Sequence, residues 1–259
     1  MKHLLTLLIL SSLALTSFAQ GEMHFKNENH GKVKELVSKT LPAYIERGVI
    51  KGNTNSTFGR NGNAIEFNKK GIKVYQIFDD GETRFPIDFK YTYKGKRIIS
   101  QAFYINSPSN TLWKTNYFKY DEKGKNIVEL CTISASGDTL ELTTYRYENN
   151  RLMTETYRNW KFPEDQYITE NSYPSNSKLA NERQYYTLRN GEKIFGSKCI
   201  ASYDKNGNEL ISKMYDANDS LTSTTSNTYF YDKKGNWVRK ETYLNEEIYK
   251  LTEREFNYY

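Results

Sequence analysis

Three tryptophans and a recurring series of tyrosines are the side chains of this sequence best suited to binding a ligand. Their flat, partly polar rings can stack on sugar rings or lie along an extended peptide. Cross-strand packing pairs in a β-sheet use the same residue types, which is the alternative explanation of their presence. The candidate binding residues are Trp113, Trp160, Trp237, Tyr120, Tyr147 and Tyr231.

The acidic residues raise the possibility of calcium binding and of glycosidase-type catalysis. Their spacing in the sequence fits neither. The stretch from Asp204 to Glu209 places oxygen ligands at alternate positions, but an EF-hand loop has its glycine and its bidentate glutamate later than this stretch supplies them. The acid pairs Asp79-Asp80 and Glu246-Glu247 lie in or near turn clusters, with no partner acid at a definable distance. We therefore predict no catalytic residue, no metal and no cofactor.

The two cysteines, Cys131 and Cys199, would form a disulfide by default in an exported protein. Counting strands places them about five strands apart, which is roughly 24 Å in a flat sheet, whereas bridged Cα atoms lie within about 7 Å. We expect two unpaired thiols, unless the sheet curls back on itself. Thiol catalysis is disfavoured because His24 and His30, the histidines beyond the N-terminal leader, lie outside the repeats.

The elements that must position these residues are short repeated hairpins. A tyrosine recurs at intervals of 26 to 30 residues, at Tyr93, Tyr120, Tyr147, Tyr173, Tyr203, Tyr231 and Tyr258. Turn clusters such as Asp232–Asn236 separate strands of about 6 to 10 residues that are rich in aromatic and β-branched side chains. In these turns the aspartate can accept amide hydrogen bonds, and glycine supplies the left-handed conformation. One module of about 27 residues is then two strands and two turns.

The predicted fold class is all-β: an antiparallel meander of tandem β-hairpin repeats in a twisted or curled sheet, with one N-terminal helix. The helix is predicted from Lys32 to Gly48, where apolar residues recur at helical spacing and Pro42 would cause a kink. It would cap the first strand edge. The predicted divisions are a signal peptide at 1–19, a lead and capping helix at 20–50, and the repeat domain at 51–259.

The first residues predict export. Lys2 and His3 precede an apolar run from Leu4 to Leu15, and Ser17 to Ala19 resembles a cleavage site before Gln20. The run of about 12 residues is shorter than the roughly 20 of a membrane-spanning helix, and no later stretch is apolar enough. Because no cysteine follows the cleavage point, we do not expect lipid attachment. The protein is expected in the periplasm or at the cell surface, and the leader looks bacterial.

The distribution of charge along the chain argues against a nucleic-acid-binding protein, and the alternation of side chains along the strands argues against an outer-membrane barrel. The 37 basic and 31 acidic residues are spread along the chain without a dense basic run, which disfavours nucleic acid as a partner. The chain has about 14 to 16 expected strands, a leader and a C-terminal aromatic residue, as an outer-membrane barrel would, but such a barrel needs an apolar outward face. After Gly235, one face of the strand carries Arg239 and Glu241 and the other carries Lys240. An outer-membrane barrel is therefore not predicted, and the sheet of repeats is preferred.

Three segments carry a resemblance to a known family. Tyr117–Gly124, Ser202–Asn208 and Tyr229–Asn236 resemble the YD repeats of Rhs and teneurin proteins, over about residues 85 to 259. The large shells of that family coil a strip of hairpins around a cargo, and this chain has too few hairpins for that. It looks more like the short, exported hairpin-repeat proteins of Bacteroidetes, for which the resemblance implies a scaffold or binding surface and no reaction.

The function favoured by these observations is a non-catalytic, exported binding or interaction module of the bacterial cell envelope. Its expected partner is a protein or glycan of the envelope, contacted through aromatic rows on an exposed face of the sheet. A homodimer through sheet edges is also expected to be feasible. Two alternatives stay open: an enzyme acting on a cell-surface polymer, and an accessory or immunity protein for a secreted toxin.

Overall fold

The computed structural model of the protein describes residues 32–52, 61–79, 84–95, 97–105, 110–162, 166–175 and 177–259. Within these ranges it has seventeen strands and no helix. The signal peptide predicted at 1–19 and the lead at 20–31 lie outside the described residues. No described helix has the length and apolar character needed to cross a membrane.

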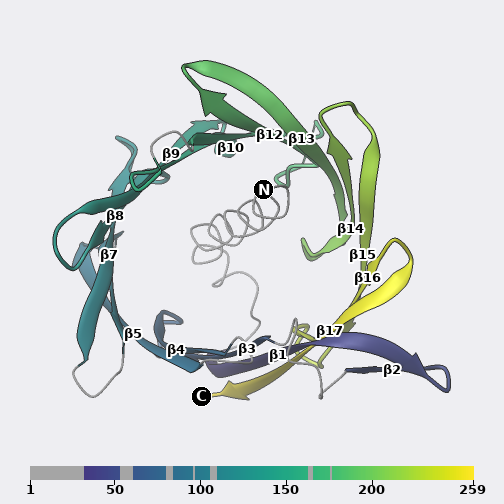
Figure 1. Ribbon diagram of the computed structural model, residues 1–259. Coiled ribbons are helices and arrows are strands. Elements are labelled where there is room, and N and C mark those ends of the chain that lie inside the picture. The colour runs from purple at the N-terminus through teal and green to yellow at the C-terminus, as the bar shows by residue number, and fades with distance from the viewer. Residues whose placement is uncertain are drawn as a thin grey trace.

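The strands form a closed ring (Figure 1). From β3 to β17 each strand is hydrogen-bonded to the next in an antiparallel meander, and β1 pairs with both β17 and β3. Sixteen of the seventeen strands belong to the ring, and β2 pairs with the end of β1. The strand bounds are β1 (Val33–Glu46), β2 (Val49–Gly52), β3 (Asn61–Phe67), β4 (Lys73–Asp79), β5 (Arg84–Lys94), β6 (Arg97–Ile105), β7 (Thr111–Tyr120), β8 (Ile127–Ser134), β9 (Thr139–Glu148), β10 (Arg151–Asn159), β11 (Gln166–Ser172), β12 (Glu182–Arg189), β13 (Glu192–Tyr203), β14 (Glu209–Asp216), β15 (Leu221–Tyr231), β16 (Trp237–Leu244) and β17 (Glu247–Tyr258).

The seam between β1 and β17 corrects the predicted open sheet. Val33 lies opposite Tyr258, and Thr40 lies opposite Thr252, with 2.9 Å between their hydroxyl oxygens. Hairpin motifs specify only neighbouring strands, whereas closure depends on twist and tilt accumulated over the whole meander. The strand after Gly235 has no apolar face, which argues against contact with lipid. That observation does not decide whether the sheet closes into a barrel. Because every ring strand is paired on both sides, a homodimer through ring edges loses its structural basis.

The predicted N-terminal helix is wrong, because Val33 to Glu46 form strand β1. A register shift between Val33 and Glu35 puts Val33 and Leu36 on one face, while Val37 and Leu41 share the other. Apolar residues on two faces with a bulge between them therefore imitate helical spacing. Gly48, the expected helix stop, lies in the β1–β2 turn with a φ of 77°.

The β1–β2 hairpin extends outside the ring (Figure 1). Its strands pair from Ala43 with Gly52 to Glu46 with Val49. The Arg239 guanidinium on β16 donates a 3.3 Å hydrogen bond to the carbonyl of Ile50. This contact holds the hairpin against the outer side of the last strands.

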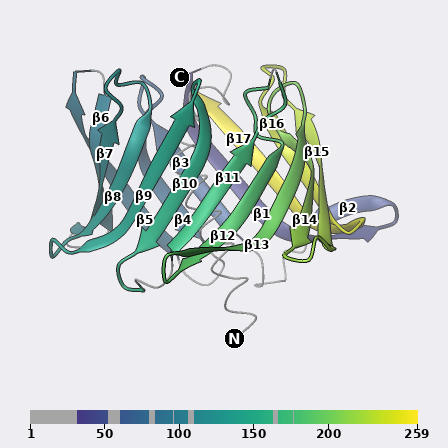
Figure 2. The same ribbon diagram turned by 90° about the horizontal axis from the view of Figure 1, so that it is seen from above.

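The predicted turn chemistry is confirmed at the Asp-x-x-Gly turns. Oδ1 of Asp204 accepts hydrogen bonds of 2.8 Å from the amides of both Asn206 and Asn208, and Gly207 has a φ of 86°. Asp232 receives the same pair of bonds, each 2.8 Å long, two and four residues ahead. These turns follow β13 and β15 and lie at the rim that holds the C-terminus (Figure 2). We call this rim the C-terminal rim.

Candidate binding site on the inner wall of the barrel

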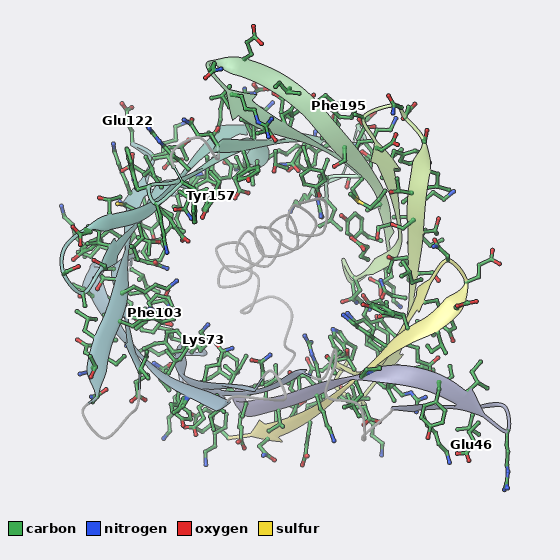
Figure 3. The ribbon with its side chains drawn as sticks, viewed as in Figure 1. Glu46, Lys73, Phe103, Glu122, Tyr157 and Phe195 are labelled. Carbon is green, nitrogen blue, oxygen red and sulfur yellow. The ribbon has the colours of Figure 1, made fainter. Side chains whose placement is uncertain are left out.

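Register assigns each described side chain to one wall of the barrel. Residues directly opposite in an antiparallel pair share a face, and successive residues alternate between faces. Figure 3 shows Lys73, Phe103 and Tyr157 directed into the ring and Phe195 on its outer side. Following the pairs from these residues round the ring gives the inner and outer walls.

The inner wall holds both apolar clusters of the described structure. The first, which we call the seam cluster, joins β1, β3 and β17 and consists of Val33, Leu36, Ile65 and Phe67 with Phe256 and Tyr258. The second joins β7 to β10 and consists of Ile127, Tyr145 and Leu152 with Phe118, Tyr120, Leu130 and Tyr147. The hydrophobic core is therefore a lining on the inside of the sheet.

An aromatic row continues this lining across β5, β6 and β7. The rings of Phe89 and Phe103 meet edge to face at 5.2 Å, and Phe103 meets Trp113 at 6.5 Å. The ammonium of Lys73 lies 4.4 Å from the ring centre of Phe89, and that of Lys114 lies 5.2 Å from Phe103. Cation–π contacts thus retain two lysines within an aromatic surface.

The outer wall is interrupted by charge all the way round the ring. Exposed, outward-facing charged residues occur within strands on every side: Lys39 on β1, Lys90 on β5, Arg146 on β9, Lys213 on β14 and Glu253 on β17. Transmembrane barrels present a continuous apolar band to lipid instead. On the outer wall, these charges alternate with exposed apolar side chains such as Val37, Tyr117 and Phe230.

The recurring tyrosines all lie on the inner wall near the C-terminal rim, and several tie one hairpin to the next. The hydroxyl of Tyr231 donates a 2.6 Å hydrogen bond to Oδ2 of Asp204, and that of Tyr258 donates a 3.0 Å bond to Oδ2 of Asp232. Tyr120 donates to the carbonyl of Ile98 at 2.9 Å. The repeat of about 27 residues follows from this geometry, since each tie spans one hairpin.

A basic and aromatic group lies on the inner wall of β15, β16 and β17. Trp237 meets Tyr229 edge to face at 5.8 Å, and the Arg254 guanidinium carbon lies 3.4 Å from the Trp237 ring centre. Lys240 pairs with Thr252, whose inner neighbours along β17 are Lys250 and Arg254. We call Lys240, Lys250 and Arg254 the basic cluster.

A buried carboxyl, Glu155, lies on the inner wall of β10. It is 7% exposed and faces Tyr145 across the β9–β10 ladder. Burial raises the pKa of Glu155 to about 7, although the charge of Arg183 acts in the opposite direction. Burial also raises the pKa of Tyr147 to about 12. Both groups are therefore largely uncharged below neutral pH, which suits an apolar surrounding.

The six predicted binding residues do not form one platform. Trp113, Tyr120, Tyr147, Tyr231 and Trp237 line the inner wall, but β7 and β16 lie on opposite sides of the ring (Figure 1). Trp160 follows the end of β10 and stacks with outward-facing Arg158, 4.1 Å from its guanidinium carbon. The bonds described above give Tyr120 and Tyr231 a structural role.

Two groups on the inner wall were missed by sequence reasoning: the basic cluster and Glu155. Alternation along β17 did contain a signal, since Lys250, Arg254 and Phe256 fall at even spacing on one face. An open sheet has no inner wall, so this face could not be recognised as enclosed before closure was known.

The acidic loop at Asp204 has its carboxylate oxygens occupied by hydrogen bonds. Besides the two amides, Oδ2 accepts bonds from the Asn208 amide group at 3.0 Å and from Tyr231. Desolvation raises the pKa of Asp204, but these hydrogen bonds outweigh it and hold the pKa below its usual value. Among the described residues, histidine, cysteine and acidic side chains form no group of three or more suited to a metal.

Both cysteines are free thiols in the structure. Cys131 lies on β8 opposite Leu142, facing outward, whereas Cys199 lies on β13 opposite Arg183, facing inward. The two thiols are therefore separated by the wall of the barrel as well as by the intervening strands. The closed ring removes the flat-sheet premise of the prediction, and it is the placement of the thiols on opposite walls that keeps them apart.

One of the solved structures compared with this chain has a TM-score above 0.5, which shows a similar fold. A porin-like protein from Bacteroides uniformis aligns with a TM-score of 0.51 at 10% identity, covering 89% of this chain and 99% of that chain. A porin-like protein from Bacteroides vulgatus aligns with a TM-score of 0.45 at 11% identity, covering 88% of this chain and 99% of that chain. No family model matches the sequence, and no curated protein matches it.

These findings overturn the resemblance to the YD repeats of Rhs and teneurin proteins. The likeness to a porin-like barrel and the closed ring point away from that family. The Tyr-Asp-x-x-Gly motif reflects a turn and a tyrosine tie, which any antiparallel meander with hairpins of this length can use. The motif therefore predicted the local turn geometry correctly and the overall fold incorrectly.

Proposed function

We propose that this protein is a non-catalytic binding barrel of the bacterial envelope that takes an apolar or amphiphilic ligand against its inner wall. The observation that carries the proposal is the contrast between the two walls. The inner wall holds both apolar clusters and the aromatic row, while charges interrupt the outer wall. A transmembrane barrel would instead present an uninterrupted apolar band on its outer wall.

The number of strands supports an interior that can take a ligand. About 8 strands give a barrel that its own side chains can fill, whereas barrels of about 16 strands are wide enough for a channel. Apolar walls with a few polar groups are typical of sites for small molecules. Export remains part of the proposal and rests on the leader-like residues 2–19.

A pair of exposed aromatic residues on β7 provides the test. Trp113 on the inner wall is 46% exposed and Tyr117 on the outer wall is 48% exposed, so their removal should disturb the fold about equally. Wild-type protein and the variants Trp113→Ala and Tyr117→Ala would be titrated with N-phenyl-1-naphthylamine, an uncharged probe that fluoresces in apolar surroundings. All three would be purified from cells that express the full chain.

We expect Trp113→Ala to weaken binding of the probe several-fold and Tyr117→Ala to leave its Kd unchanged. Loss of an aromatic contact has this effect only on the wall that holds the ligand. Equal effects of the two variants, or a larger effect of Tyr117→Ala, would contradict a ligand on the inner wall. Absence of saturable binding to the wild-type protein would contradict the proposed function itself.

A further inference from the structure

We propose that the inner wall of β7 to β10 binds a glycosyl group, with Trp113 as the surface on which a sugar ring stacks. This inference rests on the proposed function and specifies the polar part of an amphiphilic ligand. Two observations carry it: an accessible indole ring on the inner wall, and a row of polar side chains across the same strands.

A β-bulge brings Trp113 onto the inner wall. Phe103 lies opposite Lys114, and the register then shifts, so that Trp113 is the extra residue on β7. Its ring meets that of inward-facing Phe103 at 6.5 Å, and the Lys114 ammonium lies 4.8 Å from its ring centre. Two consecutive residues thus share one wall, as bulges allow. Trp113 is 46% exposed whereas Phe103 is 8% exposed, so the indole has a surface on which a sugar ring can stack.

A row of four polar side chains crosses the inner wall next to this bulge. The register places these residues directly opposite one another on β7, β8, β9 and β10: Asn116, Thr132, Glu141 and Asn159. We call these four residues the polar row. With neighbouring strands about 4.8 Å apart, the row spans roughly 14 Å. It is therefore longer than a single sugar ring.

The polar row retains hydrogen-bonding groups for a ligand. The Thr132 hydroxyl donates a 2.9 Å hydrogen bond to the amide oxygen of Asn116, which leaves the amide nitrogen of Asn116 as a donor. Nδ2 of Asn159 lies 3.4 Å from the Tyr157 hydroxyl, a long contact. Within the described part of the chain Glu141 forms no ion pair, so its carboxylate can accept hydrogen bonds from a ligand.

The charges next to Trp113 favour a neutral ligand. Burial lowers the pKa of Lys114, and the charge of Glu141 acts to raise it. One ammonium and one carboxylate supply a donor and an acceptor without net charge, which suits the hydroxyl groups of a saccharide because each can donate and accept. An extended peptide fits less well, since β7 to β10 are paired on both sides and offer no strand edge.

Two uncharged amphiphiles separate a glycosyl contact from an apolar one. Dodecyl maltoside and tetraethylene glycol monododecyl ether have the same alkyl chain, and only the maltoside carries sugar rings. Each would be used, below the concentration at which it forms micelles, to displace N-phenyl-1-naphthylamine from wild-type protein, Glu141→Ala and Glu129→Ala. Glu129 faces outward on β8 and serves as the matched control. The proteins would again be purified from cells that express the full chain.

We expect the maltoside to displace the probe from the wild-type protein at lower concentration than the ether does. Glu141→Ala should raise the Kd of the maltoside by about tenfold, the effect of losing one charged acceptor, and leave that of the ether unchanged. Glu129→Ala should affect neither. Equal displacement by the two amphiphiles, or equal effects of Glu141→Ala on both, would overturn the glycosyl site. Failure of the wild-type protein to bind the naphthylamine probe would instead contradict the proposed function, so the two failures are distinguishable.

A second variant keeps the inference testable if circular dichroism and thermal unfolding show that Glu141→Ala does not fold. Lys114→Met removes the ammonium but keeps an unbranched side chain against Trp113 and Phe103. It should lower the preference for the maltoside over the ether. A preference equal to that of the wild-type protein would count against the glycosyl site.

Free maltose distinguishes the two sources of a glycosyl group. Competition between maltose and the maltoside would support a free saccharide as the ligand. Preferential binding of the maltoside that excess maltose does not reduce would support a glycolipid, whose sugar binds only together with its alkyl chain.

Discussion

The hydroxyl of Tyr231 donates a 2.6 Å hydrogen bond to the carboxylate of Asp204, which lies 27 residues earlier at the turn of the preceding hairpin. This bond connects two consecutive turns of the C-terminal rim. It supports a turn whose carboxylate already holds two backbone amides. We therefore expect the hydrogen bond between Tyr231 and Asp204 to stabilise the C-terminal rim.

Removal of that hydroxyl tests its contribution. Tyr231→Phe should lower the free energy of unfolding by about 1 to 2 kcal/mol, because the hydrogen bond donated to Asp204 and the one accepted from the Asn208 amide group are both lost while the ring is kept. Denaturant unfolding followed by circular dichroism measures the change. Tyr117→Phe on the outer wall is the matched control and should leave the transition midpoint in place. A Tyr231→Phe midpoint equal to that of the control would show that the tie contributes nothing.

The seam depends on the inner side of β1. Leu36 is 2% exposed and Val37 is 37% exposed, although the two are adjacent in sequence. Leu36→Ala should cost roughly 2 to 5 kcal/mol through a cavity in the seam cluster, whereas Val37→Ala should change stability by less than about 0.5 kcal/mol. Thermal unfolding of both variants measures this difference. Similar losses for the two would contradict the assignment of walls.

Stability should depend on pH through Glu155. Its pKa is about 7 in the folded protein, above the ordinary value of 4.5, because of burial. The folded state therefore binds more protons than the unfolded chain between these values, so this group's contribution to the free energy of unfolding falls as pH rises through that window. The full fall would be on the order of 3 kcal/mol.

Glu155→Gln removes this dependence. The variant should gain stability relative to the wild-type protein as pH rises from about 5 to about 7.5, by urea unfolding at both values. Glu253→Gln, which alters an exposed carboxylate on the outer wall, should show no such relative gain. A difference between Glu155→Gln and wild type that is the same at both pH values would exclude the proposed titration.

The two thiols should differ in reactivity. Burial raises the pKa of Cys199 to about 11, so little of it is thiolate near neutral pH, and its side chain is inaccessible in the folded barrel. Cys131 is half-buried on the outer wall and should react first with Ellman's reagent. In Cys131→Ser, reaction should require unfolding by denaturant. Fast labelling of that variant under native conditions would contradict an enclosed Cys199.

The sequence predicted correctly those features that depend on residues close together in the chain. The Asp204 and Asp232 turns and the strands between them depend on local spacing. A helix was predicted where the structure has strand β1, because the bulge near Val33 gives the apolar residues the spacing of a helix. Closure was missed because the pairing of Val33 with Tyr258 is encoded in no local motif.

The candidate site was predictable in part for the same reason. Trp113 and Trp237 were identified by their chemistry, and both lie on the inner wall. Lys240 and Arg254 looked like ordinary charges of a solvated strand, because only the closed ring shows that their face is enclosed. Trp160 was included for its residue type alone and lies beyond the wall.

The seam between β1 and β17 also sets an order of events during biosynthesis. Thr40 and Thr252, which meet across it, are 212 residues apart, so the ribosome must have made nearly the whole chain before they can pair. Until then the growing meander has two open edges, and contacts of such long range form slowly. A chain in this state is open to pairing with other chains. Chaperones that shield exposed strands would therefore be needed most just before the last strand emerges.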